Sequence, residues 1–450
     1  MKVKVLSRNP DRYSRETSLD IHKLPRNYDP ALHPFEAQRE YTRALNAVKL
    51  ERVFAKPFLA SLDGHSDMVA LLQKHPTQLS SLFSAAADGV IKQWNIPLRT
   101  CTRTIQGHEG YVRGMTFTPD GETLISVGDD KNIRFWDVNP LLNSPEATTE
   151  AVVAKHSIIT KYVVAGVSHH AKKPLFATCG DSCLLWEGER NEPIHKYDWG
   201  VDTLSAIKFN PTQTNVLGAC ANDRSIILYD IRGGSPIRKA VLGLRSNAIA
   251  WNPMEPFVFV VANEDYNSYM FDMRRLKKPL NIFMDHVSAV IDVDFSPTGK
   301  EIVTGSYDKT IRIFEVEKGR SREVYHTKRM QRLTSVLWTM DNKYIISGSD
   351  EMNIRLWKAR AWEKLGVMRT RERDAMNYNE ALKEKFAHFP QVKRISRHRQ
   401  VPKHVYQAKK ELVTIKDSKK RKEGNRRAHT KPGTVPFVPE RQKTILSEQE

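Results

Sequence analysis

The sequence has little cysteine: its 450 residues include only four, Cys101, Cys179, Cys183 and Cys220. Four thiols in a chain of this length are too few for a disulfide scaffold, and they are typical of a protein from a reducing compartment. Cys179 and Cys183 lie close in sequence, but no second ligand pair with the spacing of a zinc site accompanies them. We therefore expect ordinary buried thiols and no metal site.

Long apolar runs are also missing. The longest, Phe257 to Ala262, is too short to span a bilayer, which takes about 20 apolar residues in a helix. The first ten residues, Met1 to Pro10, contain no apolar core of the length that a signal peptide needs. We expect an intracellular, soluble protein without a membrane partner.

Motifs of common enzyme classes are absent as well. The chain contains no P-loop, no Gly-x-Gly-x-x-Gly, no Gly-x-Ser-x-Gly and no His-Glu-x-x-His. His108, Ser126 and Asp130 could be interpreted as a nucleophilic triad. We instead expect these side chains and Trp136 to bond to one another inside a repeat, because buried polar groups need partners. We predict that the protein is not an enzyme and uses no cofactor.

What the sequence does contain is a repeat. Gly64-His65 with Trp94-Asn95 recurs as Gly107-His108 with Trp136-Asp137, a shift of 43 and 42 residues that matches the period of WD repeats. An acidic turn residue occurs in seven copies, and an aromatic side chain follows each copy five or six residues later. The acidic residues are Asp88, Asp130, Asp181, Asp223, Asp265, Asp308 and Glu351, and the aromatic residues are Trp94, Trp136, Trp186, Tyr229, Phe271, Phe314 and Trp357.

The segments between these markers have the alternation of β-strands. Asn132–Trp136 and Thr310–Phe314 place apolar and polar side chains on opposite faces. Thr118–Glu122 and Ser296–Lys300 are turn sequences, in which proline and glycine supply the required backbone angles. We predict an all-β fold, a seven-bladed WD-repeat β-propeller over residues 56–358, whose closed ring leaves only short sheet edges.

The two ends of the chain differ from the repeats in charge. The whole chain has a formal charge of +19, of which residues 359–450 carry +13 and residues 1–55 carry +4. Only +2 remains for residues 56–358. A localised positive charge is typical of a site for a polyanion, usually nucleic acid. We therefore predict three parts: an N-terminal helical or extended segment (1–55), the propeller (56–358), and a basic C-terminal domain with a tail (359–450).

Both ends also contain helical patterns. Apolar residues recur there at steps of three and four, which predicts one amphipathic helix on each side of the propeller. Pro34 precedes the N-terminal helix, and we expect Pro390 to end the C-terminal one. The apolar residues are Tyr41, Ala44, Leu45 and Val48 in the first helix, and Ala375, Tyr378, Leu382, Phe386 and Phe389 in the second.

Two groups of basic residues follow the second helix. In the first group, cations alternate with apolar and aromatic side chains, which suits phosphate contacts and stacking on unpaired RNA bases; a solvated helix face is the alternative. The second group predicts an RNA-binding arm, a nuclear import signal or both. It lies in a segment from Lys419 to Pro439 that is too polar and proline-broken to fold alone. The candidate RNA-binding residues are Lys393, Arg394, Arg397, Arg399, Lys403, Lys419, Lys420, Arg421, Lys422, Arg426 and Arg427.

These features together resemble one family. The chain is similar to the Sof-type WD-repeat family over nearly its whole length. The similarity rests on the seven WD repeats and on five motifs around them: Met1-Lys-Val-Lys-Val-Leu-Ser-Arg8, Asp11-Arg-Tyr-Ser-Arg-Glu-Thr17, Asn377-Tyr-Asn-Glu-Ala-Leu-Lys-Glu-Lys385, Arg397-His-Arg399 and Asn425-Arg-Arg427. The resemblance implies a nuclear, nucleolar subunit of the small-subunit processome. Its implied partners are pre-ribosomal RNA, the box C/D guide RNA particle and other processome proteins.

Animal members of this family also resemble substrate receptors of the cullin-4 ubiquitin ligase, which bind the ligase adaptor through a Trp-Asp-x-Arg signature. The resemblance implies that Asp230, Arg232, Asp272 and Arg274 would bind the adaptor, although another aromatic residue replaces tryptophan in both copies. A local ion pair at the end of a blade is the alternative explanation for these residues.

We therefore predict a structural scaffold for small-subunit ribosomal RNA maturation, in which the propeller docks on proteins and the basic tail contacts RNA. A substrate receptor of the cullin-4 ligase is the alternative. A third class, propellers that bind histone tails, has no specific motif in this sequence. We expect a monomer within a large complex.

Overall fold

The computed structural model describes residues 35–138, 153–188, 190–200 and 202–449. The chain forms two compact units. One comprises Met1–Pro57 with Arg360–Gln400, and the other comprises Phe58–Ala359 with Val401–Glu450. The C-terminal segment 359–450 is therefore shared between the units, and each unit is described by itself below.

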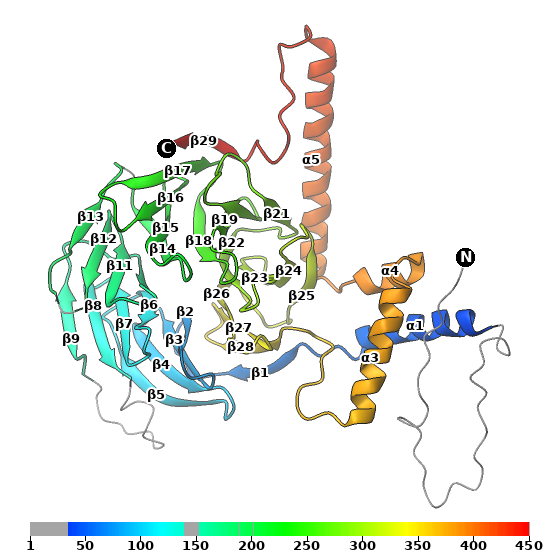
Figure 1. Cartoon of the computed structure of the whole chain (residues 1–450), viewed down its shortest axis with the longest axis horizontal. Helices are drawn as coiled ribbons and strands as arrows, with labels where there is room; N and C mark the ends of the chain where they lie inside the picture. The colour runs from blue at the N-terminus through cyan, green and yellow to red at the C-terminus, as the bar shows by residue number, and fades with distance from the viewer. Residues whose placement is uncertain (1–34, 139–152, 189, 201, 450) are drawn as a thin grey trace, which may run out of the picture. The chain divides into compact units, whose positions relative to one another are not determined.

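The larger unit contains seven antiparallel sheets, which are the blades of a propeller (Figure 1). In six of the sheets the strands follow one another in chain order, beginning with the innermost strand. Blade one consists of β2 (Val69–Lys74), β3 (Ser81–Ala86), β4 (Val90–Asn95) and β5 (Thr100–Gln106). Blade two consists of β6 (Val112–Phe117), β7 (Thr123–Gly128), β8 (Asn132–Asp137) and β9 (His156–Ile159). Blade three consists of β10 (Gly166–His169), β11 (Leu175–Cys179), β12 (Cys183–Glu187) and β13 (His195–Tyr197).

The remaining blades are numbered four to seven. Blade four consists of β14 (Leu204–Phe209), β15 (Val216–Ala221), β16 (Ser225–Asp230) and β17 (Pro236–Leu242), and blade five of β18 (Ser246–Trp251), β19 (Val258–Asn263), β20 (Asn267–Asp272) and β21 (Asn281–Met284). Blade six consists of β22 (Val290–Phe295), β23 (Glu301–Ser306), β24 (Ile311–Glu315) and β25 (Ser321–Tyr325). Blade seven consists of β26 (Leu333–Trp338), β27 (Tyr344–Ser349), β28 (Ile354–Lys358) and β1 (Phe58–Leu62).

Blade seven closes the ring. Its outermost strand is β1, which comes from the N-terminal side of the repeats and pairs with β28, so that Leu62 lies opposite Ile354. In every other blade, the outermost strand follows the aromatic marker of that blade and begins the next sequence repeat. Pairing the two ends of the repeat region removes the open sheet edges that an unclosed array would leave.

The acidic turn residue of each repeat lies between the second and third strands of its blade. The Asp308 carboxylate accepts a hydrogen bond from the Thr310 backbone N–H at 2.9 Å, and Asp88 does the same for Val90 at 3.0 Å. An Asp side chain that bonds the backbone two residues ahead replaces part of the turn's own bonding. In six of the seven blades the residue after the acid adopts a left-handed φ of 60–84°, as at Lys131 (60°) and Tyr266 (73°).

The core of the propeller lies between neighbouring sheets. Between blades one and two, Phe83, Met115, Phe117 and Trp136 belong to one buried cluster. Trp136 is 2 % exposed, and burying an aromatic side chain removes about 200 Å² from water, which contributes roughly 5 kcal/mol. Each seam between blades therefore stabilises the sheets on both of its sides.

The C-terminal segment of this unit forms an arm. Helix α5 (Lys403–His429) is followed by a connecting segment and then by strand β29 (Ile445–Gln449). β29 pairs antiparallel with β17, which makes blade four a five-stranded sheet. The expectation that Lys419 to Pro439 would not fold alone is corrected in part, because Lys419 to His429 continue α5.

The smaller unit joins helices from both ends of the chain. It contains α1 (Glu36–Val53), α3 (Thr370–Lys385) and α4 (Pro390–Arg397). Their shared core consists of Ala44, Val48, Leu382, Phe386 and Val392. Ion pairs surround this core, such as Lys385 with Glu40 at 2.6 Å and Lys383 with Glu51 at 2.8 Å. Both predicted amphipathic helices exist, and their apolar faces cover each other.

The predicted end of the second amphipathic helix was wrong. Helix α3 ends at Lys385, and Pro390 begins α4 instead of ending α3. Proline is tolerated in the first turn of a helix, because the N–H that it lacks has no partner there. Phe389, expected on the first helix, lies just before α4, with its ring centroid 5.1 Å from that of Tyr41.

Candidate functional site

The residues that could form a nucleophilic triad are a closed network inside blade two. His108 Nδ1 lies 2.8 Å from Asp130 Oδ1, and His108 Nε2 lies 2.7 Å from Ser126 Oγ. The Trp136 indole N–H donates to the same Ser126 oxygen at 2.9 Å. Ser126 and His108 are fully buried, so no substrate can approach the hydroxyl. The four side chains satisfy one another, as expected for a structural network.

Other blades contain parts of the same network. In blade six, His286 lies 2.8 Å from Asp308 and 2.7 Å from Thr304. Burial raises the pKa of Asp308, but His286 outweighs this effect and brings that pKa to about 2. In blade four, Tyr229 stands at the position of tryptophan, and its buried hydroxyl has no hydrogen-bond partner among the described residues. In blade one, Nδ1 of the buried His65 also has no hydrogen-bond partner among the described residues, so the network is complete in some blades and partial in others.

The cysteines are thiols inside the strands. Cys179 and Cys183 face each other across β11 and β12, and all four cysteines are free. Burial raises the pKa of Cys183 and of Cys220 to about 12, which keeps both sulfurs protonated. Within the described residues, no group of three or more His, Cys, Asp or Glu side chains could hold a metal ion. None of the described helices is long and apolar enough to cross a membrane.

A cavity of about 520 Å³ lies at the centre of the ring, between the innermost strands. Two of its carboxylates join blades six and seven: Asp292 accepts the Val336 N–H, and Asp294 accepts the Trp338 N–H, each at 2.8 Å. Burial is the main cause that raises the pKa of Asp292 to about 6. These carboxylates bond to backbone, so they act as links between the blades.

All members of the first group of predicted RNA-binding residues except Lys403 lie in the smaller unit. Lys393, Arg394 and Arg397 are exposed on α4, whose Val392 packs into the helical core. Arg399 is half-buried, and its guanidinium donates to the carbonyl oxygens of Ser396 and His398. Three of the four cations therefore point to solvent, and the fourth also caps the end of α4.

The second group lies on α5, in the larger unit. All but one of its members are exposed; the exception, Arg427, is half-buried, with its guanidinium 5.0 Å from the centre of the Phe437 ring. The predicted RNA-binding set is therefore divided between two units of the chain. The exposed members are Lys419, Lys420, Arg421, Lys422 and Arg426, and Lys403 of the first group is also exposed on α5.

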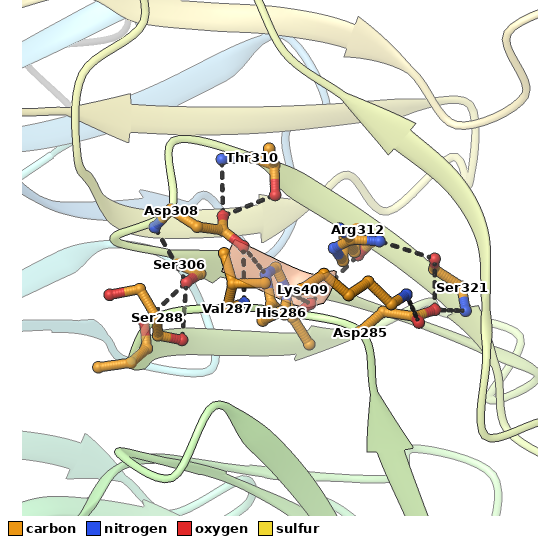
Figure 2. A network of polar contacts seen from close by, with 12 residues as sticks. Asp285, His286, Val287, Ser288, Ser306, Asp308, Thr310, Arg312, Ser321 and Lys409 are labelled. Carbon is orange, nitrogen blue, oxygen red and sulfur yellow. Dashed lines mark hydrogen bonds and ion pairs between the residues drawn. The ribbon is translucent and has the colours of Figure 1, made fainter. Parts of the chain in front are cut away.

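An ion pair attaches the root of α5, its first residues from Lys403 to Lys409, to the propeller (Figure 2). The Lys409 ammonium group lies 2.5 Å from Asp285 Oδ1, and the other carboxylate oxygen accepts the N–H and the hydroxyl of Ser321 at 2.8 and 2.9 Å. Burial raises the pKa of Asp285, but the hydrogen bond and the charge of Lys409 outweigh burial and lower the pKa to about 2. Sequence analysis did not identify either residue, because no local pattern relates positions 124 residues apart.

The same network continues into blade six. Ser321 Oγ also accepts a hydrogen bond from the Arg312 guanidinium at 3.1 Å. Arg312 is 2 % exposed, and burial lowers its pKa, while Asp308 and Asp285 act in the opposite direction. The anchor of the arm and the buried histidine network of blade six thus share one arginine (Figure 2).

The far end of the arm is held by strand pairing. Lys239 lies opposite Gln449 in the register between β17 and β29. The Arg441 guanidinium donates to the carbonyl oxygen of Leu280 in blade five at 3.2 Å. Both ends of the arm are therefore attached to the propeller, through contacts that sequence analysis did not predict.

The candidate adaptor-binding residues form two similar ion pairs at the ends of β16 and β20. Arg232 lies 2.7 Å from Asp230, and Arg274 lies 2.8 Å from Asp272. In each pair the hydrogen bond from the arginine is the main cause that lowers the pKa of the carboxyl group. The arginine side chains remain 70 % and 62 % exposed. Each pair is thus a local ion pair that still presents a guanidinium group to solvent.

The two pairs occupy neighbouring blades. Arg238 of β17 donates a hydrogen bond to the carbonyl oxygen of Arg274, which ties blade four to the end of blade five. The Arg274 guanidinium also covers the Phe257 ring, 4.3 Å from its centre. Tyr229 and Phe271, which replace tryptophan in the two signatures, are fully buried, so the replacement changes the core and leaves the exposed arginines in place.

Family models match both the repeats and the basic C-terminal segment of the chain. The family model described as Sof1-like domain matches residues 359–445. The model described as WD domain, G-beta repeat, matches residues 99–137, 277–315 and 323–358. The WD40 β-propeller domain of Doa1 resembles the structure with a TM-score of 0.56 over 67 % of this chain and 96 % of that domain. At 18 % identity, this likeness concerns the fold alone, and it confirms the predicted propeller.

Relatives match along nearly the whole chain. DDB1- and CUL4-associated factor 13 of Xenopus laevis is 55 % identical over 99 % of both chains, and the Homo sapiens protein of that name is 56 % identical over 99 % of both. Protein SOF1 of Saccharomyces cerevisiae is 45 % identical over 99 % of this chain and 94 % of its own length. These matches extend into residues 1–34, which contain two of the motifs on which the resemblance rests. Those two motifs lie outside the described residues. The predicted resemblance is confirmed, and the chain belongs to the family of WD-repeat proteins with a Sof1-like domain.

Proposed function

We propose that the protein is a structural scaffold subunit of the nucleolar small-subunit processome. In this role it supports the folding and processing of pre-ribosomal RNA and acts without catalysis. The propeller docks on protein neighbours, while the basic residues of α4 and α5 contact pre-ribosomal RNA or the guide RNA particle. The proposed localisation is the nucleus and its nucleolus.

The distribution of free positive charge is the observation that carries this proposal. Lys393, Arg394 and Arg397 on α4 are exposed, and no acidic side chain among the described residues pairs with them. These three side chains are thus available to phosphates, whereas other cations of the basic segment 359–450, such as Lys383, Lys385 and Lys409, are paired with acids. Full-length similarity to Protein SOF1 supports the same function through the family resemblance.

In-cell crosslinking to RNA, followed by sequencing of the attached fragments, tests the proposal. The test variant reverses four charges: Lys393→Glu, Arg394→Glu, Arg397→Glu and Arg399→Glu. Because phosphate contacts release counterions, we expect at least tenfold fewer crosslinks to small-subunit precursor RNA. Unchanged crosslinking at moderate salt would contradict RNA contact by α4.

A matched control is available on blades two and three. Lys155, Lys161, Lys172 and Lys173 are also exposed, and changing all four to Glu alters the net charge of the protein by the same amount. We expect this control to keep the crosslinks of the unchanged protein. Equal losses in both variants would indicate a general effect of charge in place of a site.

We propose as the alternative function a substrate receptor of a cullin-4 RING ubiquitin ligase. Two observations favour it: relatives carry the name DDB1- and CUL4-associated factor 13, and the exposed guanidinium groups of Arg232 and Arg274 lie on neighbouring blades. Two arginines at adjacent blade ends suit a protein partner with a complementary acidic surface. Under this proposal, Asp230 and Asp272 hold the two arginines in position.

Co-purification of the ligase adaptor tests the alternative. We expect Arg232→Ala with Arg274→Ala to lower recovery of the adaptor at least tenfold. Arg190→Ala is the control, because Arg190 forms a similarly exposed pair with Glu187, 64 % exposed and at 3.0 Å. Full recovery of the adaptor with the double variant would rule out adaptor binding through these residues.

A further inference from the structure

The outer half of α5 is a free-standing basic element. The root of the helix is attached to the propeller through buried Val405 and the Lys409–Asp285 ion pair. Beyond the root, α5 extends away from the blades (Figure 1). From Lys419 to Arg426 every side chain is exposed. This half of the helix therefore contributes little to the propeller and is available to a partner.

Four consecutive cations surround the helix at this point. Lys419, Lys420, Arg421 and Lys422 are successive residues of α5, and successive helical residues are rotated by about 100°. The three steps between these four residues span about 300° of the circumference. A partner with one flat surface could meet only some of these cations.

The connecting segment covers one side of the outer half. Lys443 pairs with Glu423 at 2.7 Å, and the Arg427 guanidinium lies over the Phe437 ring at 5.0 Å. Glu423 and Arg427 are one helical turn apart, so they mark one face of α5. The same segment leads on to β29, which is bound to blade four.

The cations that remain free form two faces. Lys419, Lys422 and Arg426 are spaced by three and four residues and make one ridge, while Lys420 and Arg421 lie on the other side of the helix. Helical geometry places the centres of these faces about 180° apart. Asp417, one turn closer to the propeller, is the only acid of the outer half near the second face.

We infer that the outer half of α5 binds two separate RNA segments at once, one on each face, and so bridges them. This inference rests on the proposed RNA contact and deepens it. Between Lys419 and Arg426 neither face contains an apolar side chain, although Ile415 and Val413, each 50 % exposed, precede the two faces. Phosphates of two RNA strands match the cations on opposite sides of this part of the helix. Attachment at the root and at β29 holds the two faces in place, so little freedom is lost on binding.

A capture experiment with the full-length protein tests the bridge. One RNA duplex is immobilised, the protein is added, and retention of a second, fluorescent RNA duplex is measured. One variant neutralises the first face with Lys419→Gln, Lys422→Gln and Arg426→Gln, and another neutralises the second with Lys420→Gln and Arg421→Gln. Glutamine is a good helix former, and circular dichroism checks that α5 persists.

We expect each variant to bind the immobilised RNA with a loss of a few-fold, but to retain about tenfold less of the second RNA. Lys155→Gln with Lys161→Gln is the control and should retain both RNAs. Retention of the second RNA by both variants would overturn the bridge, with α4 then supplying the second contact. An equal loss of both RNAs would also overturn it, because it indicates a single binding surface.

Two further outcomes separate the bridge from the proposed function. If the unchanged protein captures the first RNA but no second RNA, the bridge is wrong and the RNA contact stands. If it binds no RNA in the capture and yields no crosslinks in cells, both are wrong. Loss of particle association in ribonuclease-treated extract, with RNA binding intact, would assign α5 to a protein partner and overturn the bridge.

Discussion

Arginine side chains have opposite roles in the propeller and in the C-terminal arm. Within the blades, Arg312 is 2 % exposed and bonded to Ser321, and Arg355 is 5 % exposed and paired with Glu351. On the outer half of α5, Arg421 is exposed and has no acidic partner among the described residues. A buried charge must be paired to be tolerated. An exposed and unpaired charge remains free for a partner.

This difference separates stability from function in one chain. Substitutions of charged residues in the blades should change the free energy of unfolding, because they leave buried groups without partners. Substitutions on the outer half of α5 should change RNA binding and leave the propeller intact. The predictions below test this separation, from the largest expected effect to the smallest.

Loss of an acidic turn residue should have the largest effect. Asp308 is 4 % exposed and bonds to His286 and Thr310, so Asp308→Ala leaves Nδ1 of a buried histidine without its partner. We expect a decrease of about 3 kcal/mol in the free energy of unfolding, measured by chemical denaturation. Asp130→Ala, at a more exposed position, should cost about 2 kcal/mol.

Asp350→Ala is the control for this prediction, because Asp350 is an exposed residue in the blade-seven turn. It should change the free energy of unfolding by less than about 0.5 kcal/mol. A similar melting temperature for Asp308→Ala and the unchanged protein would contradict a structural role of the histidine networks.

Acidification should destabilise the propeller through its buried histidines. Burial lowers the pKa of His65 from 6.5 to about 4, so the unfolded chain binds the proton more strongly than the folded one. The free energy of unfolding should therefore fall as the pH decreases through 6.5 towards 4, by up to about 3 kcal/mol from this residue. Melting temperatures measured from pH 7.5 to 4.5 check the sign.

His65→Gln should flatten that pH dependence, because glutamine does not titrate. His195→Gln, at an exposed position in blade three, is the control and should keep it. Asp292 acts in the opposite direction: its raised pKa of about 6 favours the folded state as pH falls from 6 towards 3.8. A melting temperature that rises steadily on acidification would show that Asp292 outweighs the histidines.

Release of the arm should have the smallest effect on global stability. Lys409→Met removes one of the two cationic partners of Asp285 and leaves Arg320, at 2.8 Å; we expect faster amide hydrogen exchange at the root of α5, with a loss of about 1 to 2 kcal/mol in local stability. Lys410→Met, at the next, exposed residue, is the matched control. Equal exchange in both variants would show that Val405 and β29 hold the arm without the ion pair.

Local patterns in the sequence were sufficient for the blades. The turn acids, the aromatic markers and the alternation within segments such as Asn132–Trp136 predict strands and their order, since each of these signals acts over a few residues. The network of His108, Ser126, Asp130 and Trp136 also followed from one repeat. The left-handed conformation of the residue after the acid in six of the blades was not predicted, because Lys131 and Tyr266 have no intrinsic preference for it.

Composition indicated that the ends of the chain are basic, but not how they are arranged. The apolar steps from Ala375 to Phe389 predicted one helix, whereas the structure contains a break after Lys385 and a new helix at Pro390. The segment after Lys419 is too polar and proline-broken to be expected to fold alone, and its first residues are helical as the continuation of α5. Anchors at both ends of the arm lie far away in sequence, so they could not be inferred from its own residues.

The sequence by itself determined the seven-bladed ring and the position of the positive charge, because the repeats and the composition are local properties of the chain. Only the tertiary structure decided that β1 closes the ring with β28, that Lys409 meets Asp285, and that β29 adds a strand to blade four. These contacts join residues more than 100 positions apart. Their partners are selected by three-dimensional proximity, for which no local pattern exists.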